Sequence, residues 1–438
     1  MLNKLKCVIG LLAALFSSVS FALPTIQHWQ LNNGTNVYFV PTTGLPILDV
    51  QLMFDAGSAH DSGKLGQAAL TSALLDESAG GLTAQQVAEN IESVGAQLSA
   101  SASRDFSSIT YRSLTDEKVL ATAWPVFTDV VNSPDFLTTD FNRIKQRILL
   151  SIKQREESPG TLAQLALYEQ IYKGHPYKNP IQGTKKTVTE LDVEDVRRFY
   201  QQYYVGKNLT IVMVGGVTRQ AAEKLVDDLA GELKAGARAA QIPSVPVVST
   251  GLKVHKDYPS QQTHLLYATP VLKHNDPDYF ALHVGNHILG GSGFSSRIVK
   301  EIREERGLAY SAYSYFNAMR QKGPFLLGLQ TKNESVTEAS TALKETLDTF
   351  ITEGPTKEEL LASKKNIRGG FALKLDSNKK LMGVVAGIVV SGRPLDYLNN
   401  YLQNINDVTR DSIKDAFRRR VDMEKMVMVT VGNSDTKK

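Results

Sequence analysis

Hydrophobic positions along the chain follow two spacings, one typical of amphipathic helices and one typical of buried strands. Apolar residues recur every three to four positions in several windows, and the helices this predicts cover 65–75, 83–94, 116–131 and 162–172. Short apolar runs at 36–40 and 47–54 predict strands. Because several helices bridge the strands, instead of alternating with them one to one, the pattern favours α+β domains over a doubly wound sheet.

A unit of one helix followed by one strand occurs twice. In the first copy, Asp192 begins a helical pattern that gives way to the apolar run 209–215. In the second copy, Thr409 begins a comparable pattern that leads into 426–432. Aspartate and threonine are both good N-cap residues, and the distance from cap to closing glycine is the same in both copies. This match indicates a duplicated domain, although helix–strand units are common enough for one match to arise by chance.

A stretch rich in proline and glycine, 235–251, separates the two copies. It lacks helical spacing, which predicts an extended and semi-rigid connector. We therefore predict an N-terminal domain over 23–234, a C-terminal domain over 252–434 and a short tail at 435–438.

The first 22 residues have the layout of a secretory signal peptide. Lys4 and Lys6 precede an apolar run at 8–16, and small residues stand three and one positions before a cleavage site that follows Ala22. The run is too short to span a membrane stably, and an uncleaved anchor is the alternative. We expect a periplasmic or secreted protein. Since the single cysteine, Cys7, lies within this segment, we expect no disulfide or thiol chemistry in the exported chain.

Composition excludes two further classes of function. Charged residues make up 21% of the chain, which is ordinary for a globular protein. The formal net charge of +4 is too small to indicate a nucleic-acid-binding protein. No apolar run after the signal peptide is long enough for a transmembrane helix. We therefore expect no nucleic acid among the partners, and no membrane once the signal peptide is removed.

Three segments of the chain resemble the pitrilysin/insulinase family of zinc peptidases, in its short two-domain branch, which includes the subunits of mitochondrial processing peptidase. They are Phe-Asp-Ala-Gly-Ser at 54–58, Gly-His-Pro-Tyr with the following Pro-Ile-Gln-Gly-Thr at 174–184, and the stretch 296–311, which is the most specific. The resemblance spans nearly the whole mature chain. It implies two homologous domains, each a mainly antiparallel sheet flanked by helices.

Active members of this family carry His-x-x-Glu-His on a helix, where two imidazoles one turn apart bind zinc and the glutamate activates a water molecule. In this chain the corresponding positions are Ala69, Ser72 and Ala73, and the family's further glutamate ligand falls on Ser151. Alanine cannot bind zinc, and serine is a poor substitute for a carboxylate. The resemblance therefore implies a subunit that holds no cofactor of its own.

The resemblance also implies a role for Arg303 and Tyr310. In relatives, an arginine and a tyrosine seven residues apart reach across to the zinc-bearing domain, where they hold the substrate backbone and stabilise the oxyanion. Gly307 is expected to end the helix, which places Arg303 in its last turn and Tyr310 in the following strand. The structural alternative is that the arginine stabilises a helix C-terminus and the tyrosine packs in a strand.

The glycines before this helix, at Gly290, Gly291 and Gly293, are expected to form a mobile loop. In relatives a glycine-rich loop of this kind bears on substrate access, and a plain flexible connector is the alternative.

Two histidines, His283 and His287, have the spacing of metal ligands on a helix. The residue before the second histidine is an asparagine, which cannot act as a base, and no third ligand is evident. We interpret the pair as structural or surface histidines, with an adventitious metal site left open.

These features together predict the non-zinc-binding subunit of a periplasmic, heterodimeric zinc endopeptidase. A homologous partner bearing His-x-x-Glu-His would supply the zinc, and a peptide would be the substrate. The alternative hypothesis is a catalytically inert structural or peptide-binding protein on the same fold, for which a homodimer is possible in isolation.

Overall fold

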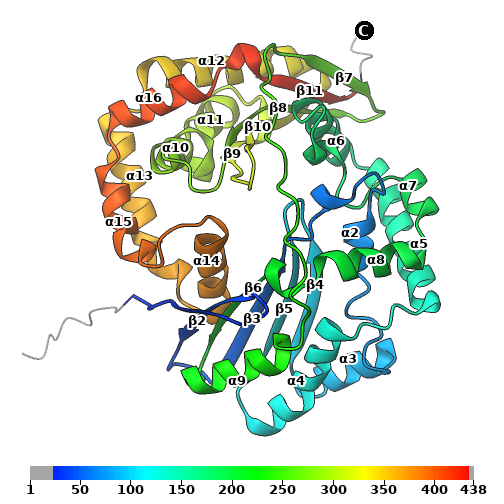
Figure 1. Ribbon diagram of the computed structural model, residues 1–438. Helices are drawn as coiled ribbons and strands as arrows, with labels where there is room; N and C mark the ends of the chain where they lie inside the picture. The colour runs from blue at the N-terminus through cyan, green and yellow to red at the C-terminus, as the bar shows by residue number, and fades with distance from the viewer. Residues whose placement is uncertain (1–22, 434–438) are drawn as a thin grey trace, which may run out of the picture.

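The computed structural model describes residues 23–433, which form two halves that are each built on one β-sheet (Figure 1). The predicted signal peptide, 1–22, and the tail, 435–438, lie outside the described residues. Mixed sheets flanked by helices confirm the predicted α+β class. None of the helices within 23–433 has the length and apolar character needed to cross a bilayer.

The N-terminal half contains a six-stranded sheet in the order β1-β2-β6-β3-β5-β4. Its strands are β1 (Gln27–Gln30), β2 (Asn36–Pro41), β3 (Ile47–Phe54), β4 (Gln97–Ala102), β5 (Ser107–Leu114) and β6 (Leu209–Gly215). Only β2 and β6 run parallel to each other, and every other neighbouring pair is antiparallel. The helices of this half are α2 (Gln67–Ser72), α3 (Ala84–Glu92), α4 (Glu117–Asn132), α5 (Thr138–Glu156), α6 (Pro159–Ile171), α7 (Lys185–Glu190), α8 (Val193–Tyr203) and α9 (Arg219–Ala230).

The C-terminal half contains a five-stranded sheet in the order β7-β11-β8-β10-β9. Its strands are β7 (Lys253–Asp257), β8 (Gln262–Leu272), β9 (Ala309–Phe316), β10 (Gly323–Lys332) and β11 (Val427–Gly432). The helices are α10 (Tyr279–Asn286), α11 (Arg297–Val299), α12 (Val336–Glu353), α13 (Lys357–Gly369), α14 (Asn378–Val390), α15 (Tyr397–Asp407) and α16 (Arg410–Arg420). As in the first sheet, one pair is parallel, β7 with β11, and the rest are antiparallel.

The two sheets have the same topology once β1 is set aside. Strands β2, β6, β3, β5 and β4 occupy the places of β7, β11, β8, β10 and β9, with the parallel pair at the same position. The repeated helix–strand unit is α8 with β6 and α16 with β11. Asp192 and Thr409 begin these two helices, and each forms a capping box with the residue three positions later. The structure thus confirms the duplication.

Each half contributes one helix to the other half's sheet. Helix α6, from the N-terminal half, packs on β8 and β11, where Leu167 and Val429 belong to one buried cluster. Helix α14, from the C-terminal half, packs on β3 and β6, and Val385 lies in the same cluster as Val212. Figure 1 shows the two helices on opposite sides of the molecule, at the places where the halves meet. Burial of apolar surface across both places stabilises the arrangement of the halves.

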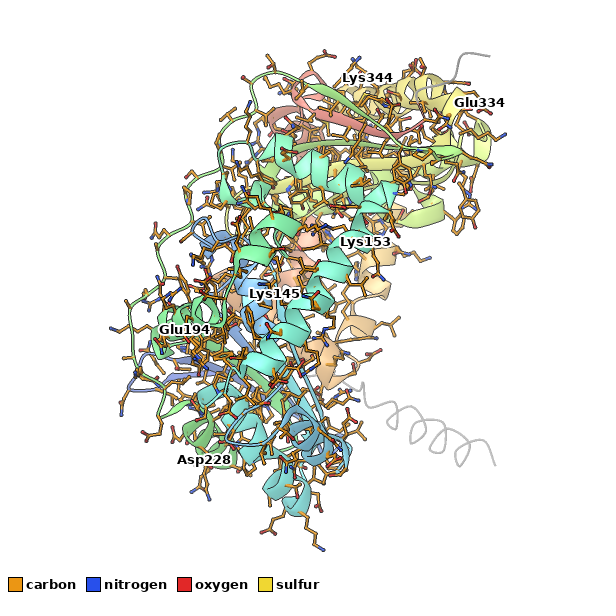
Figure 2. The ribbon with its side chains drawn as sticks, turned by 90° about the vertical axis from the view of Figure 1, so that its right-hand side faces the viewer. Lys145, Lys153, Glu194, Asp228, Glu334 and Lys344 are labelled. Atoms are coloured by element: carbon orange, nitrogen blue, oxygen red, sulfur yellow. The ribbon has the colours of Figure 1, made fainter. Side chains whose placement is uncertain are left out.

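Helix α5 leads from one half toward the other. Figure 2 shows it running along the side of the molecule, with Lys145 and Lys153 along its length. Its N-terminal part contributes Phe141 and Ile144 to the core of the N-terminal half. Pro159 then opens α6 at the position where proline is best tolerated in a helix.

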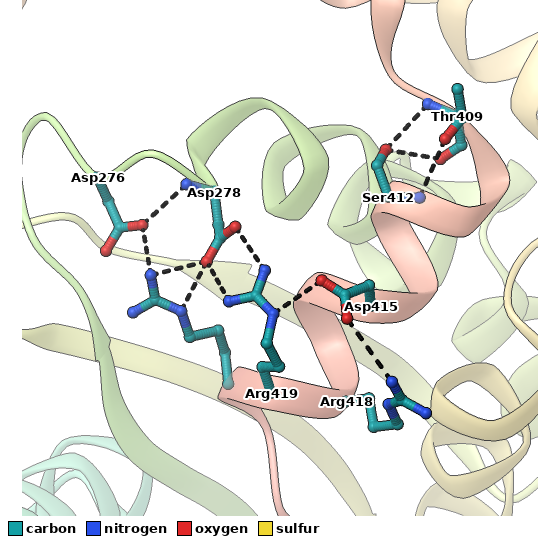
Figure 3. A network of polar contacts seen from close by, with 8 residues as sticks. Asp276, Asp278, Thr409, Ser412, Asp415, Arg418 and Arg419 are labelled. Carbon is teal, nitrogen blue, oxygen red and sulfur yellow. Dashed lines mark hydrogen bonds and ion pairs between the residues drawn. The ribbon is translucent and has the colours of Figure 1, made fainter.

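A charged network fixes the start of α10 in the C-terminal half (Figure 3). Arg419, at the end of α16, binds Asp278 through two hydrogen bonds of 2.8 and 3.0 Å. Arg420 donates to Asp278 at 2.7 Å and to Asp276 at 2.9 Å. Bidentate pairs of this kind are stronger than ordinary surface ion pairs, so the network fixes the position of α10 relative to α16.

Candidate functional site

Helix α2 carries three of the four positions at which the family's zinc site would lie. Ala69 and Ser72 are within the helix, and Ala73 is its C-cap, with its N–H bonded to the carbonyl of Ala69. Ser72 is buried and the two alanines are half-buried. The helix is shorter than the predicted 65–75: it begins after Gly66, whose φ of 95° is left-handed, and it ends at Ser72.

The N-terminus of α2 is held by Asp61, whose carboxylate accepts the N–H groups of Gly66 and Ala68 at 2.8 Å each. Burial raises the pKa of Asp61 to about 7, and the two backbone N–H groups oppose that rise. Asp61 thus fixes the start of the helix that carries Ala69 and Ser72, although neither residue offers a zinc ligand.

The fourth position, Ser151, lies on α5, which contacts α2. Its hydroxyl is 3.5 Å from Oε1 of Gln182, in the segment that follows Gly-His-Pro-Tyr. The structure thus brings Ser151 to the same region as Ala69, Ser72 and Ala73. Two alanines and two serines offer no imidazole or carboxylate, so they do not form a zinc-binding set.

A cavity of about 410 Å³ borders this region. It lies beside Ala102, at the end of edge strand β4, and two arginines line it, Arg104 and Arg155. Burial lowers the pKa of both guanidinium groups. Residue identity alone gave no reason to single out these arginines, because only the tertiary fold places them together.

The first two family segments form the junction between the halves. Asp55 is ion-paired with Arg320, from the turn between β9 and β10. The main-chain N–H of Arg320 donates to Asp105 at 3.0 Å, and the buried hydroxyl of Tyr177 donates to the same carboxylate.

His175 links the same junction to the connector. Its Nδ1 atom accepts a hydrogen bond from the N–H of Tyr177 at 3.1 Å, and its Nε2 atom donates to the carbonyl of Pro243 at 2.8 Å. These residues hold the halves together.

Arg303 and Tyr310 lie together on the surface of the C-terminal half. Arg303 lies in a short π-helical turn, η6 (Lys300–Glu305), and Tyr310 is the second residue of β9. Between them Gly307 has a φ of 62°, which allows the chain to turn from helix to strand. The guanidinium carbon of Arg303 is 4.7 Å from the ring centre of Tyr310 and 4.8 Å from that of Phe294.

Both rings are open to solvent, since Tyr310 is 79% exposed and Phe294 is 68% exposed. Arg303 forms no ion pair with any residue in 23–433, so its charge is available to a ligand. Donors of this kind can stabilise a negative oxygen when they are aimed at it. The contact of Phe294 with Arg303 was not expected from the sequence, where this residue stands among glycines and serines.

The expectation of a mobile loop at Gly290 and Gly291 is wrong. Both belong to a π-helical turn, η4 (His287–Gly291), that continues α10. A Cβ atom at Gly290 would lie 2.5 Å from the main-chain nitrogen of Ser314 on β9, so glycine is needed there for close packing. Gly293, with a φ of 65°, opens a 3₁₀ turn, Gly293–Ser295, next to Phe294.

The histidine pair has separate structural environments. His287 bonds through Nδ1 to Ser363 at 3.0 Å and through Nε2 to Asn366 at 3.1 Å, both on α13. His283 stacks on Tyr279, with 5.7 Å between ring centres. Within the described part of the chain no three His, Cys, Asp or Glu side chains are grouped so that they could hold a metal ion.

The two candidate groups belong to different halves of the protein. Arg303 and Tyr310 lie on the C-terminal half and the Ala69 group on the N-terminal half, and Figure 1 shows β9 in the upper part and α2 in the lower. Chemistry at a zinc ion by Arg303 and Tyr310 would therefore require a metal site from outside this chain's α2 and α5.

Two family descriptions match the sequence. Residues 43–185 match "Insulinase (Peptidase family M16)", and residues 190–367 match "Peptidase M16 inactive domain". Among curated proteins, the chain is 25% identical to "Non-peptidase homolog YmxG" of Helicobacter pylori, covering 98% of each chain. It is 24% identical to "Uncharacterized zinc protease YmxG" of Bacillus subtilis, covering 87% of this chain and 93% of that protein.

Solved structures of similar proteins share the fold of this chain. A peptidase M16 inactive domain from Pseudomonas fluorescens superimposes with a TM-score of 0.91 and 31% identity, covering 94% of this chain and 99% of that one. A protease from Helicobacter pylori superimposes with a TM-score of 0.87 and 21% identity, covering 94% and 100%, and this second likeness shows the fold alone.

Proposed function

The chain belongs to the M16, or insulinase, family of peptidases, and we propose that it is the non-zinc-binding subunit of a heterodimeric zinc endopeptidase. In this proposal a homologous partner supplies the His-x-x-Glu-His helix, the zinc ion and the general base. This chain supplies Arg303 and Tyr310, which hold the peptide backbone and stabilise the tetrahedral intermediate. The signal-peptide pattern at 1–22 supports a periplasmic location.

The observation that carries the proposal is the contrast between the two candidate groups. The guanidinium carbon of the half-buried Arg303 lies 4.7 Å from the ring centre of the exposed Tyr310, and Arg303 forms no ion pair within residues 23–433. The positions that would bind zinc have become Ala69, Ser72, Ala73 and Ser151. A guanidinium on η6 and an exposed phenol on β9 can serve a reaction whose metal lies on another molecule.

Strand edges support a peptide as the substrate. Tyr310 lies on β9, the edge strand of the C-terminal sheet, and β4 is the corresponding edge in the N-terminal sheet. An extended peptide can add to such an edge through main-chain hydrogen bonds, which tolerate many sequences. The cavity beside Ala102 and Arg155 lies at the end of β4 and offers space for a side chain of the peptide.

Co-expression with a homologous subunit that carries His-x-x-Glu-His tests the proposal. Cleavage of a fluorogenic peptide library is expected to need both chains. Arg303→Ala and Tyr310→Phe are each expected to lower turnover about 100-fold, the usual cost of losing an oxyanion donor, while the complex still forms on size-exclusion chromatography. Arg306→Ala, at the C-cap of η6, and Tyr313→Phe, on β9, are matched controls and should retain full turnover.

Full turnover in both the Arg303 and the Tyr310 variants would overturn the assigned roles. Peptide cleavage by this chain alone, with stoichiometric zinc, would overturn the subunit proposal. Cleavage of the exported chain after Ala22, read by N-terminal sequencing of periplasmic protein, tests the location.

A catalytically inert structural or peptide-binding protein is the second candidate. The name "non-peptidase homolog" of the Helicobacter pylori relative favours it. A stable homodimer that binds peptides, recruits no zinc-bearing homologue and supports no cleavage would identify this chain as such a protein.

A further inference from the structure

A separate cavity of about 270 Å³ lies within the C-terminal half, between α10, α14 and α15. It shares no lining residue with the Arg303 group or with the cavity beside β4. Its walls are mainly aromatic and aliphatic, with rings from Tyr279, Phe371, Tyr397 and Tyr401. Ligand sites in proteins are typically concave, largely apolar and furnished with a few polar groups, and this cavity has that character.

Two cations line the cavity, Lys374 and Arg393, and no aspartate or glutamate does. The guanidinium carbon of Arg393 lies 4.0 Å from the ring centre of Tyr279 and 4.5 Å from that of Tyr397. Its Nη1 atom donates to the hydroxyl of Tyr397 at 2.7 Å. Aromatic faces hold the arginine in one orientation, and its charge has no carboxylate partner within residues 23–433.

The acidic residues closest in sequence do not neutralise these cations. Asp278 is bound by Arg419 and Arg420, and Asp376 is paired with Lys380. Asp396 is exposed and does not line the cavity. An uncompensated positive charge beside apolar walls favours an anion with an apolar body.

His283, the first histidine of the pair with metal-ligand spacing, also lines this cavity. Burial, followed by the charge of Lys374, lowers the pKa of His283 to about 4, so the ring is neutral near pH 7. Its Nε2 atom is buried and has no hydrogen-bond partner in the described part of the chain. A neutral imidazole with one free nitrogen adds a hydrogen-bonding group without adding charge.

Two glycines of α14 keep the cavity open. Gly383 and Gly387 both line it, and a Cβ atom at either position would meet nothing within 4 Å. Glycine inside a helix costs about 1 kcal/mol relative to alanine. Neither position needs glycine for close packing. The two glycines therefore lower the stability of the helix and leave the cavity free of side chains at these positions.

We propose that this cavity is a binding site for a small organic carboxylate with an aromatic or similarly flat apolar body. Arg393 and Lys374 bind the carboxylate, and the tyrosine rings and aliphatic wall contain the apolar part. The carboxylate belongs either to a free small molecule or to the C-terminal residue of a peptide. The neighbouring cavity between the halves, which shares Ala318 and Gly387 with this one, gives a peptide end a route to it.

Titration of the mature chain alone tests this proposal by calorimetry and saturation-transfer NMR. The probes are 3-phenylpropionate, its uncharged amide 3-phenylpropionamide, and N-acetyl-phenylalanine as a mimic of a peptide C-terminus. A ligand of this size is expected to bind with a Kd on the order of 1 mM. The amide should bind at least 10-fold more weakly than the acid, because it lacks the charge. Binding of either acid supports the site, and the acid that binds more tightly identifies the source of the carboxylate.

Matched variants locate the site. Arg393→Gln should weaken binding about 10-fold, and Lys365→Gln, an exposed lysine on α13 outside the cavity, should not change it. Gly387→Leu should abolish binding and raise the melting temperature, since it fills open space within a helix. Equal affinity for acid and amide, or unchanged binding in a folded Gly387→Leu variant, would overturn the proposal. The assay needs no partner subunit, so its outcome is independent of the peptidase proposal.

Discussion

Replacement of Tyr177 by phenylalanine should weaken the junction between the two halves by removing one hydroxyl. Tyr177 is fully buried, and its hydroxyl donates to the carboxylate of Asp105 while accepting the N–H of Gln321 at 3.2 Å. Burial, together with the charge of Asp105, raises the pKa of Tyr177 well above its ordinary value, so the hydroxyl keeps its proton at neutral pH. Phenylalanine preserves the ring and its packing and removes only these two bonds.

The magnitude follows from the two lost bonds. A hydrogen bond to a charged group contributes about 1.5 to 3 kcal/mol, and a buried donor left without a partner costs about 1 to 3 kcal/mol. Asp105 keeps the N–H of Arg320 at 3.0 Å, which limits the loss. We therefore expect Tyr177→Phe to lower the free energy of unfolding by about 3 kcal/mol.

Urea unfolding, followed by circular dichroism and tryptophan fluorescence, measures this loss. Both tryptophans, Trp29 and Trp124, lie in the N-terminal half, so a separation of the two probes would show the halves unfolding independently. The control is Tyr310→Phe, whose exposed ring makes the expected change smaller than about 0.5 kcal/mol.

A double-mutant cycle with Asp105→Asn isolates the bond itself. We expect a coupling free energy of about 2 kcal/mol between Tyr177 and Asp105. If the two substitutions were additive within about 0.5 kcal/mol, the hydrogen bond would not stabilise the junction and the reasoning would be refuted.

Three further predictions concern stability and metal binding. Hydrogen bonds from Arg419 lower the pKa of Asp278, so this carboxylate stabilises the fold above the unfolded pKa near 3.9, and the stabilisation is lost as pH falls through the folded pKa. Asp278→Asn should lower the free energy of unfolding, measured in urea, by about 1 to 2 kcal/mol at pH 7 and by clearly less at pH 3.5. An equal loss at both pH values would contradict this. Gly290→Ala should lower the free energy of unfolding by about 2 kcal/mol, because its Cβ atom would lie 2.4 Å from Oγ of Ser314. Gly383→Ala should raise the free energy of unfolding, because its Cβ atom would point into open space. Thermal denaturation of both variants measures these changes. Added zinc, or a chelator, should shift the melting temperature of this chain by less than about 1 °C, and a larger shift would reveal a specific metal site.

The local sequence was sufficient to predict much of the secondary structure. Short apolar runs located β2 and β3, and apolar residues every three to four positions located several helices. The caps at Asp192 and Thr409 located the repeated helix–strand unit. These features depend on neighbours within about one helical turn, which is why one sequence reveals them. Helices α12 to α15 were not delimited. The glycines at 290 and 291 were interpreted as a loop, because the close contact of Gly290 with Ser314 comes from a distant strand.

The residue types alone also show that α2 cannot bind zinc in the family's way, since the side chains of Ala69 and Ala73 have no metal-binding atom in any fold. The tertiary structure decided what the remaining residues do. It joins Tyr177 and Asp105, 72 residues apart, by a hydrogen bond at the junction. It also packs α6 on the sheet of the C-terminal half and α14 on the sheet of the N-terminal half. It also gathered Arg393, His283 and the open positions of α14 around one cavity. Such contacts join segments far apart in the chain, and they form only because burial of two apolar faces brings those segments together.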